Sequence, residues 1–560
     1  MRSAARFMST LLVSAGVCLD ASGQGGVPTL QQLDFLPTSC NSDGSVLFGY
    51  NIGALDGTSN RIYRWTPAGG RVELPLPPGA GFVYLFREDA GPSHTVSANG
   101  NVIAASVYPS PNACCPTSVV RWQGTAMTAT PLFDLAQGIT SDGLKVYGNT
   151  DDFEQSAVVW TGGQVTALGV PQGAPPGQTW VSDSSDTGDV MVGTYWDNAA
   201  DAVAPVVWRA GKAQFLPVIG SLIAPGAFAR HVSADGAVIV GSRTVLGDDR
   251  NPKSWKVVRW CNGRVAEMAL PPGLLGNGSK ALSEDGSAVI VSLSSSATNE
   301  SFLARWTLTL GIQSIAPITF ASQISTNGCV VVGDAYDVEQ DMSLPYVWTP
   351  SIGAWPLQQY LASRGVELQD CTLRDSSCTP DGSVIFGMLT RPDGSVRGYR
   401  LAGLALPDAA IPRAPANIRA TDGTSTSNVT ATWTTSQGAT GYKVYRSIHP
   451  AAPTLLATLG NVSSYVDTSA TPGVIYEYVV RATNASGESG IGGADDGFRA
   501  GSPCIGDLNA DRSVNGDDLG QLLGAWGPVP SGTSADLNGD GAVNGNDLGA
   551  LLGRWGTCPP

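Results

Sequence analysis

The sequence predicts a mainly β protein of three consecutive modules: a β-propeller of seven or eight blades, a β-sandwich and a small α-helical module. Three observations lead to this prediction. One short sequence phrase recurs eight times between residues 28 and 405. It is followed by a segment in which strand-like runs of alternating apolar and polar residues flank a tryptophan, and two similar acidic loops lie near the end of the chain. Only 14% of the 560 residues are charged, whereas 69 are glycine and 37 are proline, so turns are frequent and long surface helices scarce. We place the propeller at 24–405, a linker at 406–412, the sandwich at 413–499 and the helical module at 500–560.

The N-terminus has the pattern of a secretory signal. Arg2 and Arg6 accompany an apolar stretch over 7–19, and small residues follow at 21–23. We therefore predict a signal peptide over 1–23 and a secreted protein, extracellular or associated with the cell surface; a buried N-terminal strand or helix is the alternative. No later stretch reaches the ~20 apolar residues of a membrane span. A net charge of −15 without any Lys/Arg cluster argues against nucleic acid as a partner.

The repeated phrase, S-x-D-G-x-V-x-x-G, returns about every 45 residues and combines a turn with a buried strand. Its central dipeptides are Asp43-Gly44, Asn99-Gly100, Asp142-Gly143, Thr187-Gly188, Asp235-Gly236, Asp285-Gly286, Asn327-Gly328 and Asp381-Gly382. Asp-Gly between β-branched runs predicts a hairpin, because the turn needs a positive φ. A repeat of four short strands is typical of a propeller blade; a β-solenoid is the alternative. We expect the dipeptides to have a structural role.

A tryptophan at the end of an apolar run follows each of the first seven copies. These are Trp65, Trp122, Trp160, Trp208, Trp260, Trp306 and Trp348, and Leu401 takes the place in the eighth copy. We expect each large ring to stack between adjacent sheets. With Ile62-Tyr63-Arg64-Trp65 and Val258-Arg259-Trp260 the pattern resembles the HAF-type repeats of bacterial extracellular proteins. That resemblance implies an extracellular repeat fold and no settled activity.

Residues 406–412 are rich in Pro and Ala, so few packing contacts are expected there. The segment that follows carries Val429-Thr-Ala-Thr-Trp433, Tyr442-Lys-Val-Tyr-Arg446 and Tyr476-Glu-Tyr-Val-Val-Arg-Ala482. It resembles a fibronectin type III domain, in which Trp433 is the core tryptophan and Tyr476 fits the tyrosine corner. The resemblance implies a spacer, with carbohydrate contact as a second role.

Two twelve-residue loops near the C-terminus place oxygen-bearing residues at positions 1, 3, 5, 9 and 12, with position 7 contributing its backbone carbonyl. The predicted ligands are Asp507, Asn509, Asp511, Ser513, Asn515 and Asp518 in the first loop, and Asp536, Asn538, Asp540, Ala542, Asn544 and Asp547 in the second. This is EF-hand-like spacing with Asp in place of Glu at position 12, and it predicts two Ca²⁺ sites.

Each loop continues into an apolar pattern at i, i+3, i+4 and i+7. The positions are Leu519, Leu522, Leu523 and Trp526, then Leu548, Leu551, Leu552 and Trp555. We expect two short helices that pair through one apolar stripe each, with Gly527 and Gly556 as C-caps. Cys504 and Cys558 bracket the unit and are predicted to form a disulfide worth about 4 kcal/mol in the chain-entropy model. Cys371 and Cys378 could close a second, short loop.

The duplicated loop and helix resemble a type I dockerin, which implies a cohesin-like or cell-surface protein as partner. Two departures matter. Arg512 replaces the glycine of loop position 6, where a left-handed conformation costs a side-chained residue about 1 kcal/mol or more, so we expect the first site to bind Ca²⁺ more weakly. Positions 10 and 11 are Gly516-Asp517 and Gly545-Asn546 instead of the Ser/Thr pairs of well-known cellulosomal dockerins.

Together these features predict a secreted, non-catalytic protein in which the propeller recognises a ligand, polysaccharide being a candidate, and the last module docks through calcium. The alternative is an extracellular polysaccharide hydrolase or lyase carried by that module, which would need two facing carboxylates. Acidic candidates, expected in solvated loops, are Asp248, Asp249, Asp334, Asp337, Glu339 and Asp341. The three histidines are isolated along the sequence, so no catalytic residue is predicted.

Overall fold

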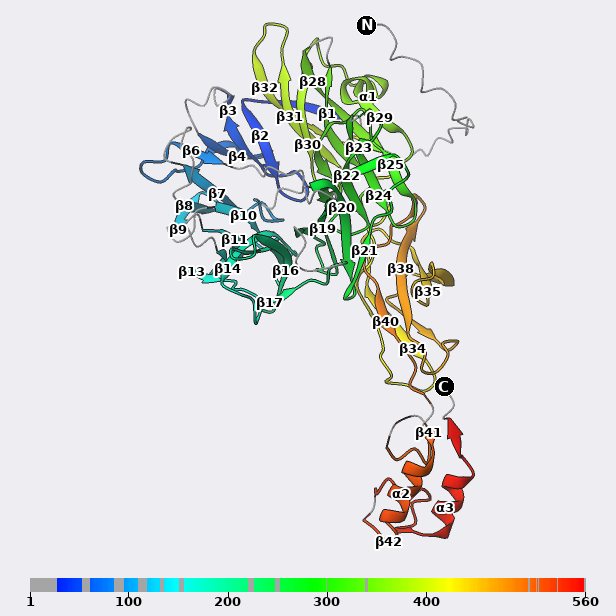
Figure 1. Ribbon diagram of the computed structural model, residues 1–560. Helices are drawn as coiled ribbons and strands as arrows, with labels where there is room; N and C mark the ends of the chain where they lie inside the picture. The colour runs from blue at the N-terminus through cyan, green and yellow to red at the C-terminus, as the bar shows by residue number, and fades with distance from the viewer. Residues whose placement is uncertain are drawn as a thin grey trace.

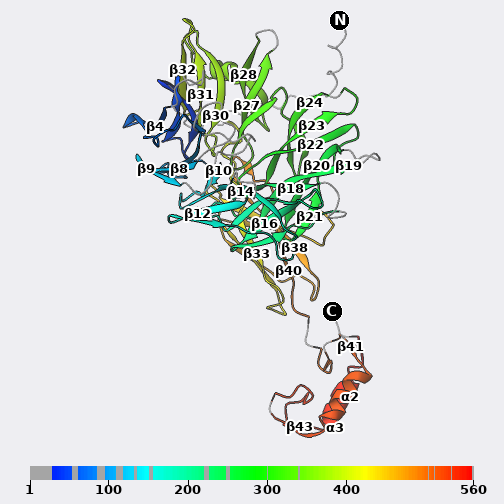
Figure 2. The ribbon, with the colours of Figure 1, turned by 60° about the vertical axis from the view of Figure 1, so that its left-hand side comes forward.

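The computed structural model describes residues 28–52, 61–84, 95–108, 118–130, 135–150, 156–219, 226–246, 252–298, 300–337, 341–501, 504–509, 511, 513–530 and 532–557. The predicted signal peptide, Cys558, Arg512 and the acidic residues 248, 249 and 339 lie outside these ranges. The described chain forms a large array of β-sheets, a β-sandwich beside it and a small helical module at the C-terminal end (Figures 1 and 2).

Eight four-stranded antiparallel sheets make up residues 29–402. The first four are β2 (Phe35–Cys40), β3 (Leu47–Asn51), β4 (Ile62–Thr66), β5 (Gly70–Glu73); β6 (Phe82–Tyr84), β7 (Val102–Tyr108), β8 (Ser118–Gln123), β9 (Ala126–Thr130); β10 (Leu135–Ile139), β11 (Lys145–Asn149), β12 (Ala157–Thr161), β13 (Gln164–Ala167); and β14 (Gly177–Ser184), β15 (Val190–Asp197), β16 (Ala202–Arg209), β17 (Lys212–Phe215).

The other four sheets continue in chain order, except that the last one borrows the first strand of the chain. They are β18 (Ala227–Val232), β19 (Val238–Leu246), β20 (Pro252–Cys261), β21 (Arg264–Glu267); β22 (Leu274–Leu282), β23 (Ala288–Ser295), β24 (Ser301–Thr307), β25 (Gly311–Ser314); β26 (Phe320–Ile324), β27 (Val331–Asp337), β28 (Met342–Thr349), β29 (Gly353–Pro356); and β30 (Thr372–Cys378), β31 (Val384–Thr390), β32 (Val396–Ala402), β1 (Thr29–Leu33).

The eight sheets close into a ring. A buried hydrophobic cluster joins each sheet to the next, and Phe386 of the eighth sheet packs with Phe35 and Leu47 of the first. Pairing of β1 with β32, from Thr29 opposite Ala402, ties the two ends of the ring together. We call this assembly the ring.

The recurring dipeptides all lie in the turn between the first and second strands of a sheet, as predicted. Each glycine of a dipeptide has a φ between +65 and +75°. In the fifth copy, Asp235 Oδ1 accepts the Ser233 hydroxyl at 2.7 Å and the Ala237 N–H at 3.0 Å. The Ser233 oxygen in turn accepts the Val238 N–H at 2.9 Å. The serine and the acid of the phrase therefore satisfy the turn's own backbone, which explains why they recur together.

The turns also bond to one another around the centre of the ring. A backbone N–H of one turn donates to the backbone carbonyl of the next. The pairs are Ser42 to Ala98, Ala98 to Ser141, Ser141 to Asp186, Asp186 to Ala234, Ala234 to Glu284, Asp285 to Thr326 and Thr326 to Pro380. The next donor in this series, between the eighth and first sheets, would be Pro380, and proline has no N–H. Seven bonds thus link eight turns, and we call these eight turns the hub.

An arginine beside the predicted tryptophan position links several sheets to the next. Its guanidinium donates to the glycine carbonyl of the next turn, in the pairs Arg64–Gly100, Arg121–Gly143, Arg209–Gly236, Arg305–Gly328 and Arg400–Gly44. Arg400 bridges the eighth sheet to the first and also lies 5.9 Å from the ring centroid of Trp65. The tryptophans lie on third strands; Trp122, Trp208 and Trp260 donate their indole N–H to a carbonyl of the preceding connection, as expected of rings packed between sheets.

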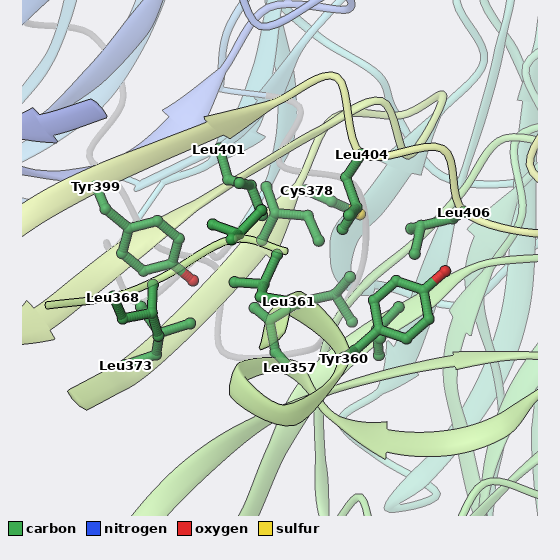
Figure 3. Close-up of a cluster of buried hydrophobic side chains, with 14 of the residues drawn as sticks. Leu357, Tyr360, Leu361, Leu368, Leu373, Cys378, Tyr399, Leu401, Leu404 and Leu406 are labelled. Carbon is green, nitrogen blue, oxygen red and sulfur yellow. The ribbon is translucent and has the colours of Figure 1, made fainter. Parts of the chain in front are cut away.

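The helix α1 (Leu357–Ser363), which follows β29, packs one face against the seventh and eighth sheets (Figure 3). Leu357 and Leu361 are fully buried and Tyr360 nearly so, facing Tyr399 and Leu401 of β32. Leu401 thus fills with an aliphatic side chain the place that tryptophan has in the other sheets.

The cysteines of the eighth sheet contradict one expectation. Cys371 and Cys378 are both free. They lie at the two ends of β30, and a strand rises about 3.3 Å per residue, so the two thiols are too far apart for a disulfide. Cys504 is disulfide-bonded, whereas its predicted pairing with Cys558 stays a prediction.

The sandwich consists of two antiparallel sheets. They are β33 (Ala416–Ala420), β34 (Val429–Thr434) and β37 (Ser464–Asp467), facing β36 (Thr454–Gly460), β35 (Gly441–Ser447), β38 (Tyr476–Asn484), β39 (Gly487–Glu488) and β40 (Asp495–Gly497). Trp433 is 5% exposed and its ring lies 5.4 Å from that of Tyr442. The Tyr476 hydroxyl accepts the Thr471 N–H at 3.3 Å, the contact expected of a tyrosine corner.

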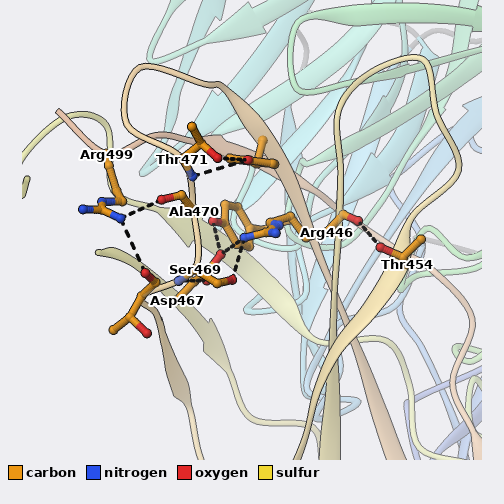
Figure 4. A network of polar contacts seen from close by, with 10 residues as sticks. Arg446, Thr454, Asp467, Ser469, Ala470, Thr471 and Arg499 are labelled. Atoms are coloured by element: carbon orange, nitrogen blue, oxygen red, sulfur yellow. Dashed lines mark hydrogen bonds and ion pairs between the residues drawn. The ribbon is translucent and has the colours of Figure 1, made fainter. Parts of the chain in front are cut away.

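One buried carboxylate organises the turn after β37 (Figure 4). Asp467 is 1% exposed and accepts hydrogen bonds from Arg446, Tyr478 and the N–H and hydroxyl of Ser469, at 2.5 to 2.8 Å. Burial alone would raise the pKa of Asp467, but these donors outweigh it and hold the pKa below its ordinary value.

The segment between ring and sandwich is packed, so the prediction of few contacts there is wrong. Leu406 is 5% exposed within the cluster of Figure 3. The Asn327 side chain donates to the Ile411 carbonyl at 2.7 Å, and the Ala414 N–H donates to Asp285 at 2.8 Å. Polar groups of the ring's turns therefore capture the backbone of the segment, an arrangement that the sequence of residues 406–412 does not reveal.

The sandwich rests on the same face of the ring as these turns. Arg264 of β21 pairs with Glu477 at 2.9 Å and with Asp496 at 2.6 Å, and Arg259 donates to the Gly492 carbonyl. The turn face of the ring is therefore partly covered, and the opposite ends of its strands face away from the sandwich.

The terminal module contains two short helices and two small β pairs. Its elements are β41 (Ser513–Val514), α2 (Gly516–Gly524), β42 (Gly527–Pro528), β43 (Ala542–Val543), α3 (Gly545–Leu552) and β44 (Gly556–Thr557), with β41 paired to β44 and β42 to β43. Leu522 and Leu551 are fully buried between them.

Two details of the helix prediction are wrong. Half of the apolar stripe is about 50% exposed, namely Leu523, Trp526, Leu552 and Trp555. Each helix ends before its tryptophan, so the i+7 position no longer lies on the apolar face of the helix. The tryptophans therefore lie outside the small core. The C-caps are Ala525 and Gly553, whereas Gly527 and Gly556 lie in the short strands with φ of +117 and +127°.

Candidate functional site

The first acidic loop brings three carboxylates together. Ligand oxygens of Asp507, Asp511 and Asp518 all lie within 4.8 Å of one another. These side chains come from loop positions 1, 5 and 12, with α2 beginning two residues before Asp518. Oxygens at such spacing suit a hard divalent cation, because Ca²⁺ takes six or more oxygen ligands at about 2.4 Å.

The remaining predicted ligands of the first loop surround Asp511. Its carboxylate accepts the side-chain amides of Asn509 at 3.0 Å and Asn515 at 3.3 Å, and the Ser513 N–H at 2.8 Å. The structure therefore brings Asn509, Ser513 and Asn515 into contact with Asp511, one of the three clustered carboxylates.

The second loop repeats these contacts. Asp540 accepts the amides of Asn538 at 2.9 Å and Asn544 at 3.4 Å and the Ala542 N–H at 3.0 Å. Asp536 differs in accepting the N–H groups of Gly539 and Gly541 at 2.9 and 2.8 Å. Over the described part of the chain, a group of three or more carboxylates within 4.8 Å of one another occurs in the first loop only.

The acid at position 12 of each loop also caps its helix. Asp518 and Asp547 have no exposed surface and accept the N–H of the N-cap residues, Asn515 at 2.9 Å and Asn544 at 2.8 Å. Burial would raise the pKa of Asp518, but four backbone donors outweigh it and hold the pKa below its ordinary value. For Asp547 the N-cap N–H is the main cause of a lowered pKa. Both acids stay ionised, the form that a cation requires.

A cavity of about 430 Å³ lies at the hub and was not predicted. Its lining includes Asp186 and Glu284 from the turns, and Arg413 from the segment leading to the sandwich. Burial and the Asp186 carboxylate raise the pKa of Glu284 to about 7, against the Thr326 hydroxyl at 3.0 Å and the charge of Arg413. Glu284 occupies the variable second position of the sixth copy of the phrase, and an acid at that position is the feature of the sequence that could have indicated this site.

A pair of carboxyl groups between the seventh and eighth sheets was also missed. Asp334 lies in β27 and is 7% exposed, so the expectation that it sits in a solvated loop is wrong. Burial, together with the charge of Asp375 on β30, raises the pKa of Asp334 to about 8. Asp334 and Asp375 lie close enough for each to affect the pKa of the other. The sequence does not indicate that these two side chains meet.

The comparisons with known proteins concern the fold. A scan against protein-family models finds no match, and a search of curated proteins finds none. Among solved structures, an Fn3-like protein from Clostridium thermocellum is 27% identical over 16% of this chain and 96% of its own, with a TM-score of 0.15.

Two further solved structures are similar to larger parts of the chain at low identity. The β-propeller domain of the Trilobed protease from Pyrococcus furiosus is 9% identical over 54% of this chain and 92% of its own, with a TM-score of 0.35. TolB from Acinetobacter baumannii is 10% identical over 57% and 78%, with a TM-score of 0.29. The ring is therefore defined by its own strand pairing. In the described ranges, no helix has the length and apolar character needed to span a bilayer.

Proposed function

We propose that this chain is a secreted, non-catalytic modular protein whose last module docks through calcium and whose ring is an eight-bladed β-propeller that recognises a ligand. The convergence of Asp507, Asp511 and Asp518 is the observation that carries the calcium part. The same spacing of residues and contacts in the second loop supports a second site.

In this proposal Ca²⁺ replaces the internal hydrogen bonds of each loop. The amide oxygens at positions 3 and 9 turn toward the ion, position 7 offers its backbone carbonyl, and the three carboxylates supply the charge. So small a core needs such support, because few of its side chains are fully buried. Calcium would then hold α2 and α3 in place for docking.

The docking surface in this proposal is the exposed apolar pair on each helix end. Leu523 lies in the last turn of α2 and Trp526 just after it, as Leu552 ends α3 and Trp555 follows it, and all four are about half exposed. Exposed large apolar side chains at matching positions mark an interaction site. The dockerin resemblance supports a cohesin-like or cell-surface protein as the partner.

Limited proteolysis of the full chain tests the calcium part. With Ca²⁺ the module should resist cleavage, and with EDTA a protease should remove residues beyond about 500 while the ring and sandwich persist. Asp518→Asn and Asp547→Asn, each in one loop, should each make one site more sensitive to chelation. Equal cleavage of the wild-type protein with and without EDTA would contradict the proposal.

The two sites should differ in affinity. Gly541, at position 6 of the second loop, has a φ of +87°, and the corresponding residue of the first loop is Arg512. Relieving ~1 kcal/mol of strain with Arg512→Gly should tighten the first site about fivefold, measured by calorimetric titration of Asp547→Asn and of the double variant. Unchanged affinity would show that position 6 does not set the difference.

A further inference from the structure

A groove of about 380 Å³ opens between the fourth and fifth sheets. Trp180 of β14, Trp196 of β15 and Phe228 of β18 line it. No described sandwich residue contributes to it. Trp196 near the end of β15, Asp201 just before β16 and Phe228 near the start of β18 lie at the strand ends opposite the turns on which the sandwich rests. The groove therefore opens on the face of the ring away from the sandwich.

Flat aromatic surfaces form its apolar part. Trp196 is 44% exposed, and Trp180 and Phe228 are partly exposed. Trp255 of β20 packs against Phe228, with ring centroids 5.5 Å apart and planes tilted by 50°. An exposed tryptophan beside a second partly exposed one, on rigid strands, offers a preformed platform for a ligand with an apolar face.

Two β-bulges add polar groups at matching positions. The register of β14 shifts around Ser182 and that of β18 around Arg230, and both bulged residues line the groove two positions after an aromatic residue. A bulge re-aims the extra side chain. The Arg230 guanidinium lies 5.5 Å from the centroid of the Phe228 ring, and Asp201 borders the same groove.

We propose that this groove binds pyranose residues of a polysaccharide. A pyranose has an apolar face of C–H groups that stacks on an aromatic ring, and hydroxyls at its edge that pair with a carboxylate, a guanidinium or a hydroxyl. Asp201, Arg230 and Ser182 supply these three groups beside the rings. A nucleic acid also stacks on aromatic rings, but the net charge of −15 repels a polyanion. The assignment rests on the proposed recognition role of the ring and is independent of calcium docking.

Affinity electrophoresis of the full chain tests the groove, in gels that contain a soluble β-glucan, xylan, galactomannan or starch. Each gel is run with Ca²⁺ and with EDTA, so that an effect of the terminal module on migration is separated from binding in the groove. The variants are Trp196→Ala, Trp180→Ala and Arg230→Gln. Phe320→Ala is the matched control, because Phe320 is 57% exposed and precedes the bulged Ser322 of β26 by two positions, outside the groove.

We expect retardation by at least one of the four polysaccharides, equally with and without EDTA. Trp196→Ala should weaken it about tenfold or more, as loss of an aromatic anchor does, Trp196→Phe should restore part of it, and Phe320→Ala should leave it unchanged. Absence of retardation in all four gels would overturn the proposal. Retardation that Trp196→Ala and Trp180→Ala leave intact, or that Phe320→Ala abolishes equally, would overturn it as well.

Discussion

Glu284 makes the stability of the ring depend on pH in a direction opposite to that of most carboxylates. Its pKa rises from 4.5 to about 7 because burial and Asp186 disfavour the charged form. The folded state therefore holds a proton that the unfolded chain releases at lower pH. The contribution of protonated Glu284 to the free energy of unfolding is fully present below pH 4.5. It is lost as the pH rises from there to 7, because the unfolded state then binds fewer protons than the folded one.

The size of this loss follows from the pKa. One pKa unit corresponds to about 1.4 kcal/mol, so ionising Glu284 in the folded ring costs about 3 kcal/mol above pH 7. Glu284→Gln removes the ionisable proton but keeps an oxygen for the Thr326 hydroxyl, which donates at 3.0 Å. The variant should be more stable than the wild type by up to about 3 kcal/mol at pH 8 and equally stable near pH 4.5.

Urea unfolding followed by tryptophan fluorescence measures the difference, at several pH values between 4.5 and 8. Asp186→Asn should give a smaller gain at pH 8, because it removes the neighbouring charge but leaves Glu284 ionisable. Glu367→Gln, at an exposed position, serves as the control and should change nothing. A gain for Glu284→Gln that is the same at every pH, or no gain at pH 8, would refute the reasoning.

Three further changes test how the ring is held together. Gly236→Ala should lower the free energy of unfolding by about 2 kcal/mol or more, because φ is +73° and the new Cβ would lie 2.5 Å from Val190 Cγ2; a neutral result in urea would show that the turn can relax. Arg400→Ala should cost about 1–2 kcal/mol by removing the 3.0 Å bond to the Gly44 carbonyl, and a melting temperature equal to the wild type's would speak against that bond's role at the junction. Arg264→Ala should change the melting temperature little, since partly exposed ion pairs contribute about 1 kcal/mol or less, but should speed proteolysis between ring and sandwich; an unchanged cleavage rate would indicate that other contacts suffice.

Local sequence was enough wherever structure is made by neighbours along the chain. The dipeptide at Asp235-Gly236 needs only its own serine and the left-handed glycine to form its turn, so eight copies predicted eight turns between strands. The loop from Asp507 to Asp518 is equally local, and the spacing of its oxygens led directly to the carboxylates that converge. Tyr476 and Thr471 are five residues apart, which is why the tyrosine corner could be recognised.

Tertiary structure decided the features in which distant segments meet. Asp334 and Asp375 come from different sheets, Trp180 and Phe228 from neighbouring ones, and Asn327 reaches a segment that looked like a free linker. Burial and charge at such places depend on which strands become neighbours, and one sequence without its relatives carries no record of that pairing. The periodicity of the chain therefore determined its turns, strands and acidic loops, whereas the closure of the ring decided which side chains lie buried together and which face water.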